Sequence, residues 1–221
     1  MTGPLALVGG REWGEGCTFD ADLLAASGST EVLVMPTAAA YEHPARAVEN
    51  ATGYFAGLGA SVRALMVLNR IDAEDPENVA AVRNARFIYL GSGSPLHLRS
   101  VLKQSPLWQA MEEAWREGAV LAGSSAGAMV LGDPMVDPRG GAFTLGLGLI
   151  EQVAVLPDAA TWSHERLRRT ISLTNNGVAL LVLDEQTAAI RGPDGGWTVS
   201  GVGRAEVHLD GEVVGLDALP A

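Results

Sequence analysis

The residues from Val120 to Leu131 hold the arrangement with the clearest chemical meaning. Gly123-Ser-Ser-Ala-Gly127 lies there between a short apolar strand and a helix-compatible apolar run. In a Gly-x-Ser-x-Gly turn of this kind the serine is strained, its hydroxyl is exposed, and the next backbone N–H points to where a negative oxygen would form. The pattern predicts Ser125 as a nucleophile and Ala126 as an oxyanion donor. The alternative is a glycine-rich turn whose serine takes no part in chemistry.

A second glycine-rich turn precedes another helix. Gly91-Ser-Gly-Ser-Pro95 follows an apolar strand, and its backbone N–H groups could supply a second oxyanion donor opposite Ala126. Ser92 and Gly93 are the candidates. The alternative is an ordinary strand-to-helix connection.

The elements that must position these turns alternate along the chain. Continuously apolar strands separated by amphipathic helices are typical of a parallel sheet covered on both faces. Strands are expected at Leu5–Val8, Glu31–Met35, Val62–Leu68, Phe87–Leu90, Ala119–Ala122 and Val153–Leu156. Helices are expected at Asp20–Ser27, Pro44–Leu58, Glu77–Asn84, Pro106–Gly118 and Ser163–Leu173.

The last part of the chain differs. Short β-rich segments at Leu180–Asp184, Thr187–Arg191, Trp197–Ser200, Ala205–Leu209 and Glu212–Val214 are separated by turn residues. We expect one α/β domain over residues 1–221, a three-layer mostly parallel sheet with helices on both faces. Its parallel core would span 1–176, and an antiparallel extension would span 177–221.

Ligands of such sheets collect at the carboxyl ends of the strands. Four loops should meet there: Pro36–Ala39, Gly91–Pro95, the serine turn, and Pro157–Trp162. This convergence favours a site around Ser125.

Composition excludes several classes of protein. The net charge of −11 leaves no basic stripe for nucleic acid or an anionic membrane. The single cysteine, Cys17, excludes an internal disulfide and is expected to be a loop thiol without a role. The first residues suggest a core strand instead of a signal peptide, and no segment has the length of a membrane span, so a cytoplasmic protein is expected.

Several segments together resemble the dipeptidase E and cyanophycinase family of serine peptidases, whose core is similar to class I glutamine amidotransferases. They are Leu7–Gly10, Met35–Ala38, Ile88–Gly93, Gly123–Ala128 and Gly146–Ile150, and their order and spacing match over roughly the first 175 residues. The resemblance implies Ser125 as the nucleophile, and an oxyanion hole formed by Ala126 and the Ser92–Gly93 turn. True amidotransferases carry cysteine at the position of Ser125.

The sequence departs from that family at the base. A serine hydroxyl needs a base, because it is too weakly acidic at neutral pH. The family places a histidine in a Pro-His pair, where this chain has Pro157-Asp158. The base is therefore either an unusual arrangement around Asp158 or the nearby His164. Ser163 could cap the helix that His164 begins, and a helix N-terminus favours neutral imidazole. The alternative for His164 is an exposed first-turn residue.

Other titratable residues have weaker assignments. His97 is expected to be either structural or substrate-facing, His43 has no partner, and His208 is expected on a strand surface. The third member of a triad stays open between Asp133, Asp137 and Glu185, the first two of which are also ordinary turn residues.

We therefore expect a serine hydrolase that cleaves a peptide or amide bond through an acyl-enzyme on Ser125. The alternative is a catalytically impaired relative, with Asp158 in place of histidine, that acts as a binding or regulatory module. A glutamine amidase is a third, weaker possibility. Neither a cofactor nor a metal is expected. The partner would be a small peptide or amide substrate, with no nucleic acid and no membrane, and by resemblance the protein could form a homodimer.

Overall fold

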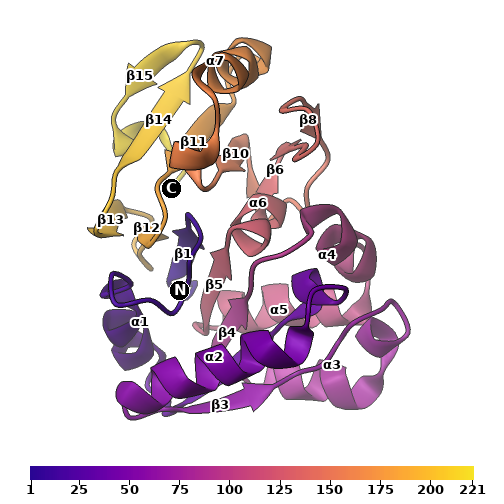
Figure 1. Cartoon of the computed structure of the whole chain (residues 1–221). Helices are drawn as coiled ribbons and strands as arrows, with labels where there is room; N and C mark the ends of the chain where they lie inside the picture. Colours follow the sequence, from indigo (N-terminus) through magenta and orange to yellow (C-terminus); the bar gives the residue numbers. More distant parts are fainter.

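A computed structural model describes all 221 residues of the chain. Its main sheet has seven strands and forms the lower layer of the molecule (Figure 1). Its order is β13-β12-β1-β5-β4-β2-β3. The strands are β1 Leu5–Val8, β2 Glu31–Met35, β3 Ser61–Ala64, β4 Phe87–Leu90, β5 Val120–Ser124, β12 Thr187–Arg191 and β13 Trp197–Gly201. The pairs from β1 to β3 are all parallel, whereas β12 and β13 add antiparallel pairs at the β1 edge.

Helices cover both faces of this sheet, as predicted. Alternate side chains of each strand point to opposite faces, so two separate apolar clusters form. One cluster packs α1 Phe19–Ser27 and α2 Pro44–Gly57 against the sheet. The other packs the helices on the opposite face, α3 Pro76–Arg83, α4 Pro95–Leu102, α5 Pro106–Arg116 and α6 Ala126–Leu131. The predicted α/β class with helices on both faces is confirmed.

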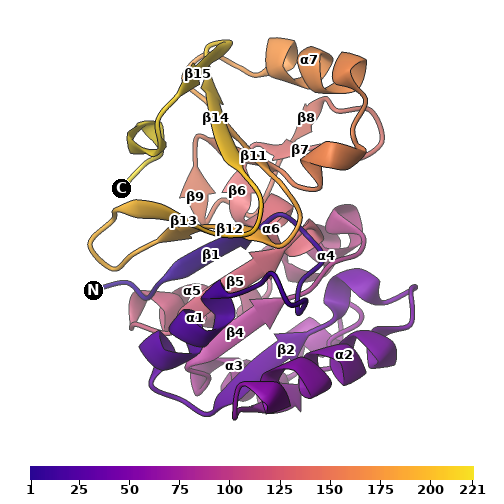
Figure 2. The same ribbon diagram turned by 60° about the vertical axis from the view of Figure 1, so that its left-hand side comes forward.

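A second sheet lies above the first and carries α7 His164–Leu173 (Figure 2). Its order is β15-β14-β11-β10-β6-β9. The strands are β6 Gly132–Asp133, β9 Ile150–Glu151, β10 Val153–Leu156, β11 Ala179–Leu183, β14 Ala205–Leu209 and β15 Glu212–Val214. A two-stranded pair, β7 Met135–Val136 with β8 Phe143–Thr144, and short 3-10 helices at Thr37–Ala39, Asp72–Glu74, Ala159–Thr161 and Leu216–Ala218 complete the fold.

The second sheet corrects part of the sequence interpretation. The strand at Val153–Leu156 exists, but it pairs with β11 and β6 instead of joining the main sheet. The expected antiparallel extension is divided: β12 and β13 extend the main sheet, whereas β14 and β15 extend the second one. β3 also ends at Ala64, short of the expected Leu68. The assignment of residues 1–221 to one domain stays a prediction.

His208 is the other correction, because it is buried and not on a strand surface. β14 is an inner strand of the second sheet, and Leu180 and Val213 flank His208 across its neighbours. Its Nε2 lies 3.6 Å from the Glu206 carboxylate.

None of the helices combines the length and the apolar composition that a membrane span requires.

Candidate active site

The turn at residues 123–127, which we call the serine turn, connects β5 to α6. Ser125 has φ 47° and ψ −105°, an unfavourable backbone conformation for a residue with a side chain. Both glycines are required by close packing. A Cβ at Gly123 would lie 2.6 Å from the carbonyl carbon of Gly127, and one at Gly127 would lie 2.4 Å from the Leu90 oxygen. The predicted tight turn with a strained serine is therefore present.

Asp158 is the hydrogen-bond partner of Ser125. Ser125 Oγ donates to Asp158 Oδ2 at 3.2 Å. Asp158 itself has left-handed φ and ψ of 52° and 41°, and its N–H donates to the Gly9 oxygen at 2.8 Å. That backbone bond ties the end of β10, in the second sheet, to the end of β1, in the first. The site is thus assembled where the two sheets meet.

Burial favours the neutral form of Asp158. Desolvation raises the pKa of this half-buried carboxyl, the Ser125 hydrogen bond lowers it, and the negative charges of Glu185 and Glu12 raise it further. The net shift of the pKa is upward. A carboxylate with a raised pKa is a stronger proton acceptor than an ordinary aspartate.

His164 lies outside the hydrogen bonds that surround Ser125. It is the first residue of α7, its side chain is exposed, and it makes no side-chain hydrogen bond, whereas Ser163 caps the helix by accepting the Arg166 N–H. The structure brings Asp158, and not His164, into hydrogen-bond contact with Ser125.

Neither His97 nor His43 forms a hydrogen bond with Ser125 or Asp158. His97 Nε2 lies 2.9 Å from the Leu68 oxygen, and its ring packs edge-on against Tyr41. His43 is exposed, with φ 60°, directly before α2.

Cys17 is buried, and burial raises the pKa of its thiol to about 11, so it is a poor nucleophile at neutral pH.

The three candidate acids occupy different places. Asp133 accepts the Gly146 N–H at 2.7 Å, and Asp137 forms an exposed pair with Arg139 that lowers the pKa of Asp137 to about 2. Glu185 is the one whose charge acts on Asp158, and it also pairs with Arg11 at 3.2 Å. Glu185 is therefore the acid of the three that lies at the site.

Two backbone N–H groups near the serine turn lack partners. Gly93 N–H makes no hydrogen bond, and Ala126, as the first residue of α6, has no intrahelical partner for its own N–H. Ser92 N–H is different, because it donates to Glu12 Oε1 at 2.8 Å. Of the two residues predicted from the glycine turn, only Gly93 has a free donor.

Glu12 was missed by the sequence interpretation. It lies in the loop after β1, and its carboxylate also accepts from the hydroxyls of Ser92 and Ser124, the latter at 2.7 Å. The signal that could have found it is Gly9-Gly10 directly after the first apolar strand. The loop after that strand must lie at the same carboxyl edge of the parallel sheet as the serine turn.

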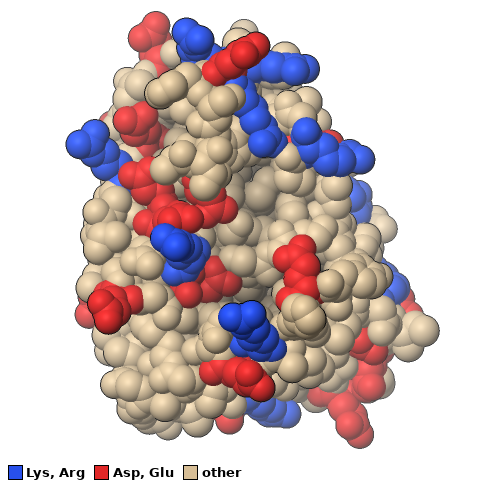
Figure 3. Space-filling model, in the orientation of Figure 1, with Lys and Arg blue, Asp and Glu red and all other residues tan.

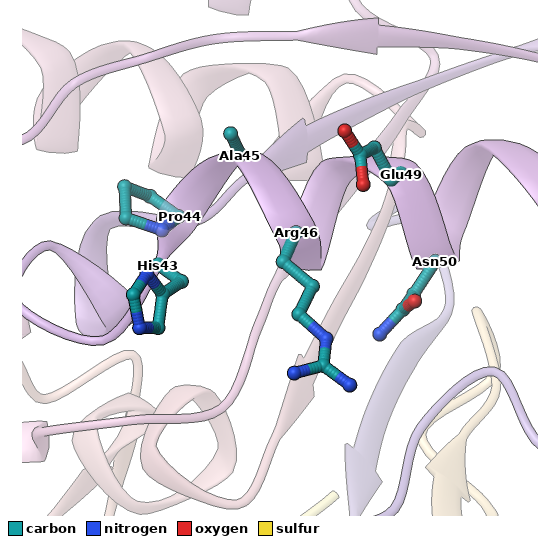
Figure 4. A pocket seen from close by; sticks show the side chains of 6 residues that line it. All are labelled: His43, Pro44, Ala45, Arg46, Glu49 and Asn50. Carbon is teal, nitrogen blue, oxygen red and sulfur yellow. The ribbon is translucent and has the colours of Figure 1, made fainter.

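A surface hollow of about 280 Å³ adjoins the glycine turn. Its lining includes Glu12 and Gly93 on one side. On the other side it includes Arg46 and Asn50 of α2 and His43, the residue directly before α2. In Figure 4 these three side chains lie on the same side of the α2 ribbon, and they also line a wider hollow. The hollow could receive the part of a ligand that extends past Gly93.

Charge is unevenly distributed on the face seen in Figure 3. Basic side chains gather at the top, over α7, which carries Arg166, Arg168 and Arg169. Arg166 stacks over the Trp162 ring at 3.7 Å. Acidic side chains predominate on the left, and the middle of the face is hollowed. No group of three or more His, Cys, Asp or Glu side chains is placed to hold a metal ion.

Solved structures with the same architecture include a peptidase from an acI-B1 Actinobacterium. The two chains are 32% identical and superpose with a TM-score of 0.85 over 95% of this chain and 91% of that one. A putative Peptidase E protein from Listeria monocytogenes, 16% identical, superposes with a TM-score of 0.71 over 92% of this chain and 100% of that one, which shows a shared fold.

Curated relatives include proteins named cyanophycinase. The one from Synechococcus elongatus is 32% identical over 66% of this chain and 48% of its own length, and the one from Geminocystis herdmanii is 28% identical over 85% and 73%. The chain thus spans about half the length of the first of these relatives. The sequence pattern of Peptidase family S51 matches residues 9–192, a range that includes the serine turn, Asp158 and Glu185. From this match, and from the shared architecture, the chain belongs to Peptidase family S51.

Proposed function

We propose that this protein is a serine peptidase in which Ser125 is the nucleophile and Asp158 the general base. The observation that carries the proposal is the 3.2 Å hydrogen bond from Ser125 Oγ to Asp158 Oδ2, made by a serine in a strained strand-to-helix turn. Membership of Peptidase family S51 supports the reaction class.

The proposed reaction has two halves. Ser125 Oγ attacks the carbonyl carbon of a peptide bond while its proton passes to Asp158 Oδ2. The tetrahedral intermediate then expels the amine, which takes the proton from Asp158, and an acyl-enzyme remains. Water attacks the ester with its proton passing to Asp158, and Ser125 recovers a proton as the acid leaves.

The unpaired N–H groups of Gly93 and Ala126 are the proposed oxyanion donors. Both lie on turns that adjoin Ser125, and neither has another acceptor. Fixed donors of this kind stabilise the negative oxygen because they need no reorganisation during the reaction.

A carboxylate can do the work of the missing histidine if its proton affinity is raised. Burial and the nearby charges of Glu185 and Glu12 shift the pKa of Asp158 in that direction. The same shift makes its protonated form a usable acid for the leaving amine.

The substrate class we propose is a short peptide. The hollow between Gly93 and α2 would hold the part of the peptide beyond the scissile bond. Cyanophycin, suggested by the names of the curated relatives, is one peptide to test alongside simple dipeptides.

The test is labelling of Ser125 by a fluorophosphonate, followed by intact mass and peptide mapping. We expect one adduct on Ser125 in the unaltered protein, none in Ser125→Ala, and labelling at least about 100-fold slower in Asp158→Asn. His164→Ala is the matched control and should be labelled at the unaltered rate. A folded protein that never labels Ser125 would overturn the proposal, and loss of labelling in His164→Ala would move the base to His164.

A second candidate function is a binding module that has lost catalysis. Aspartate at position 158, where the family resemblance implies histidine, favours it. Asp158→His distinguishes the two. Peptidase activity that appears only in this variant supports the binding module, whereas activity in the unaltered protein that Asp158→Asn abolishes excludes it.

A further inference from the structure

We propose that Glu12 is a positioning residue that fixes the glycine turn against the serine turn, so that the Gly93 N–H faces the reacting carbonyl. This inference rests on the proposed function for its catalytic consequence, but the positioning can be measured without catalysis. Glu12 makes no hydrogen bond to Ser125; it acts through Ser92 and Ser124.

Three donors converge on the Glu12 carboxylate. Oε1 accepts the Ser92 N–H at 2.8 Å, and Oε2 accepts the hydroxyls of Ser92 and Ser124. Ser92 belongs to the glycine turn, and Ser124 is the fully buried residue directly before Ser125. One carboxylate therefore joins the two turns that carry the proposed oxyanion donors.

The loop that carries Glu12 is held in an unfavourable conformation. Arg11 and Trp13, its immediate neighbours, both have left-handed φ, of 50° and 62°. Residues with side chains adopt this conformation only where the surroundings enforce it. The Trp13 ring packs on Tyr89 at 5.4 Å, and Gly10 accepts the Gln186 N–H at 2.8 Å. Strain on both sides of one residue indicates that the loop is built to place that residue.

The glycine turn is fixed on both sides of Gly93. Ser92 is held by Glu12, and the Ser94 N–H donates to the Ala38 oxygen at 2.8 Å. Gly93 has φ 138°, and a Cβ there would lie 2.3 Å from that same oxygen. With both neighbours held, the Gly93 peptide has one orientation. Loss of the Glu12 bonds would release one of the two sides.

Glu12 has a second effect, through its charge. The groups whose charges act on Asp158 are Glu12, from the loop after β1, and Glu185, from the loop after β11, which is itself paired with Arg11. Replacing Glu12 by glutamine keeps an acceptor for Ser92 but removes one negative charge near Asp158. A residue that only maintained the fold would not alter the pH dependence at Ser125.

The experiment compares Glu12→Ala, Glu12→Gln and Ser124→Ala, with Glu15→Gln as control. Glu15 is an exposed carboxylate of the same loop and makes no hydrogen bond. Amide hydrogen exchange of residues 91–94 measures the positioning, and the fluorophosphonate rate constant at Ser125 measures its consequence.

We expect faster exchange at Ser92 and labelling slowed about 100-fold in Glu12→Ala, in keeping with the cost of a misplaced donor. Glu12→Gln should retain a labelling rate within a few-fold of the unaltered protein at neutral pH. The acid limb, meaning the fall of the labelling rate as pH decreases, should move to lower pH in this variant. Ser124→Ala should lie between the two, and Glu15→Gln should change nothing.

Unchanged exchange at Ser92 in Glu12→Ala overturns the inference, as does unchanged labelling in that variant. If Glu12→Ala does not fold, unchanged exchange at residues 91–94 together with unchanged labelling in Ser124→Ala overturns it instead. If the unaltered protein never labels Ser125, the proposed function fails, and exchange at residues 91–94 still decides whether Glu12 positions the turn.

Discussion

At the scale of single residues, the unusual feature is an aspartate that accepts a hydrogen bond from the hydroxyl of the strained serine. Asp158 was expected near the site from the family resemblance, as a departure from it. Its contact with Ser125 could not be predicted from sequence, because it depends on the left-handed backbone at Asp158 and on a bond to Gly9 in the other sheet. Both are properties of the tertiary structure.

The pH dependence of Ser125 labelling is the first prediction. In the proposed mechanism the reactive form requires the Asp158 carboxylate, whose pKa is raised above its ordinary value by burial. The rate should therefore fall as pH decreases through this raised pKa and stay level above it. In Asp158→His the limb should move up toward the ordinary histidine range, about 6.5.

Fluorophosphonate labelling, quenched at successive times between pH 4 and 8, measures the acid limb in the unaltered protein and in Asp158→His. Circular dichroism at each pH serves as the control for folding. An identical limb in the two proteins would show that another group takes the proton.

At the scale of elements, the parallel core could be read from sequence, and the second sheet could not. The strands at Leu5–Val8 and Phe87–Leu90 are buried on both faces and therefore continuously apolar, which local pattern reveals. β6 and β9 have two residues each, too few for any periodicity. The pairing of β10 with β11 is a choice of partner that local sequence does not encode.

The serine turn supplies the second prediction, on stability. Gly127→Ala should destabilise the protein by about 1–3 kcal/mol, because the added methyl group would meet the Leu90 oxygen at 2.4 Å. Gly53→Ala is the matched control: it lies within α2, nothing is within 4 Å of its Cβ, and it should stabilise by about 0.5–1 kcal/mol. Urea unfolding measures both. Equal effects of the two substitutions would contradict the close approach of α6 to β4.

The buried end of α1 supplies the third prediction. Asp20 is fully buried, neither carboxylate oxygen has a hydrogen-bond partner, and burial raises its pKa to about 8. The folded state therefore binds a proton that the unfolded state releases above pH 4. This contribution to stability is complete below about pH 4 and is lost as pH rises toward 8, by at most about 1.4 kcal/mol per pH unit.

Asp20→Asn removes that titration and should gain stability relative to the unaltered protein as pH rises. Urea unfolding at pH 5 and pH 8 gives the comparison. The same difference in unfolding free energy at both values would show that Asp20 does not titrate in this range.

At the scale of the whole molecule, the site spans the junction of two sheets. Ser125 directly follows β5 of the first sheet, and Asp158 follows β10 of the second. The convergence of loops at one rim was predicted from a single sheet, and it holds although β10 lies in another. The loop after β1, which carries Glu12, was not counted among those loops, so the most heavily bonded carboxylate of the site was missed.

Attachment of a phosphonate to Ser125 should be felt in both sheets, which is the fourth prediction. Hydrogen exchange should slow in residues 9–12 and in residues 158–162, because an adduct that fills the site stabilises the loops around it. Helix α3, which lies on the opposite side of the main sheet from α2, is the internal control and should be unchanged. Protection confined to the serine turn would mean that the second sheet takes no part.

The left-handed backbone of Asp158 has a consequence for the history of the site. Aspartate, asparagine and histidine are the side-chain-bearing residues that most readily accept this conformation. Aspartate and histidine codons also differ at one nucleotide. A lineage could therefore exchange an imidazole for a carboxylate at this position in one mutational step with the main chain unmoved, and the exchange would be equally easy to reverse.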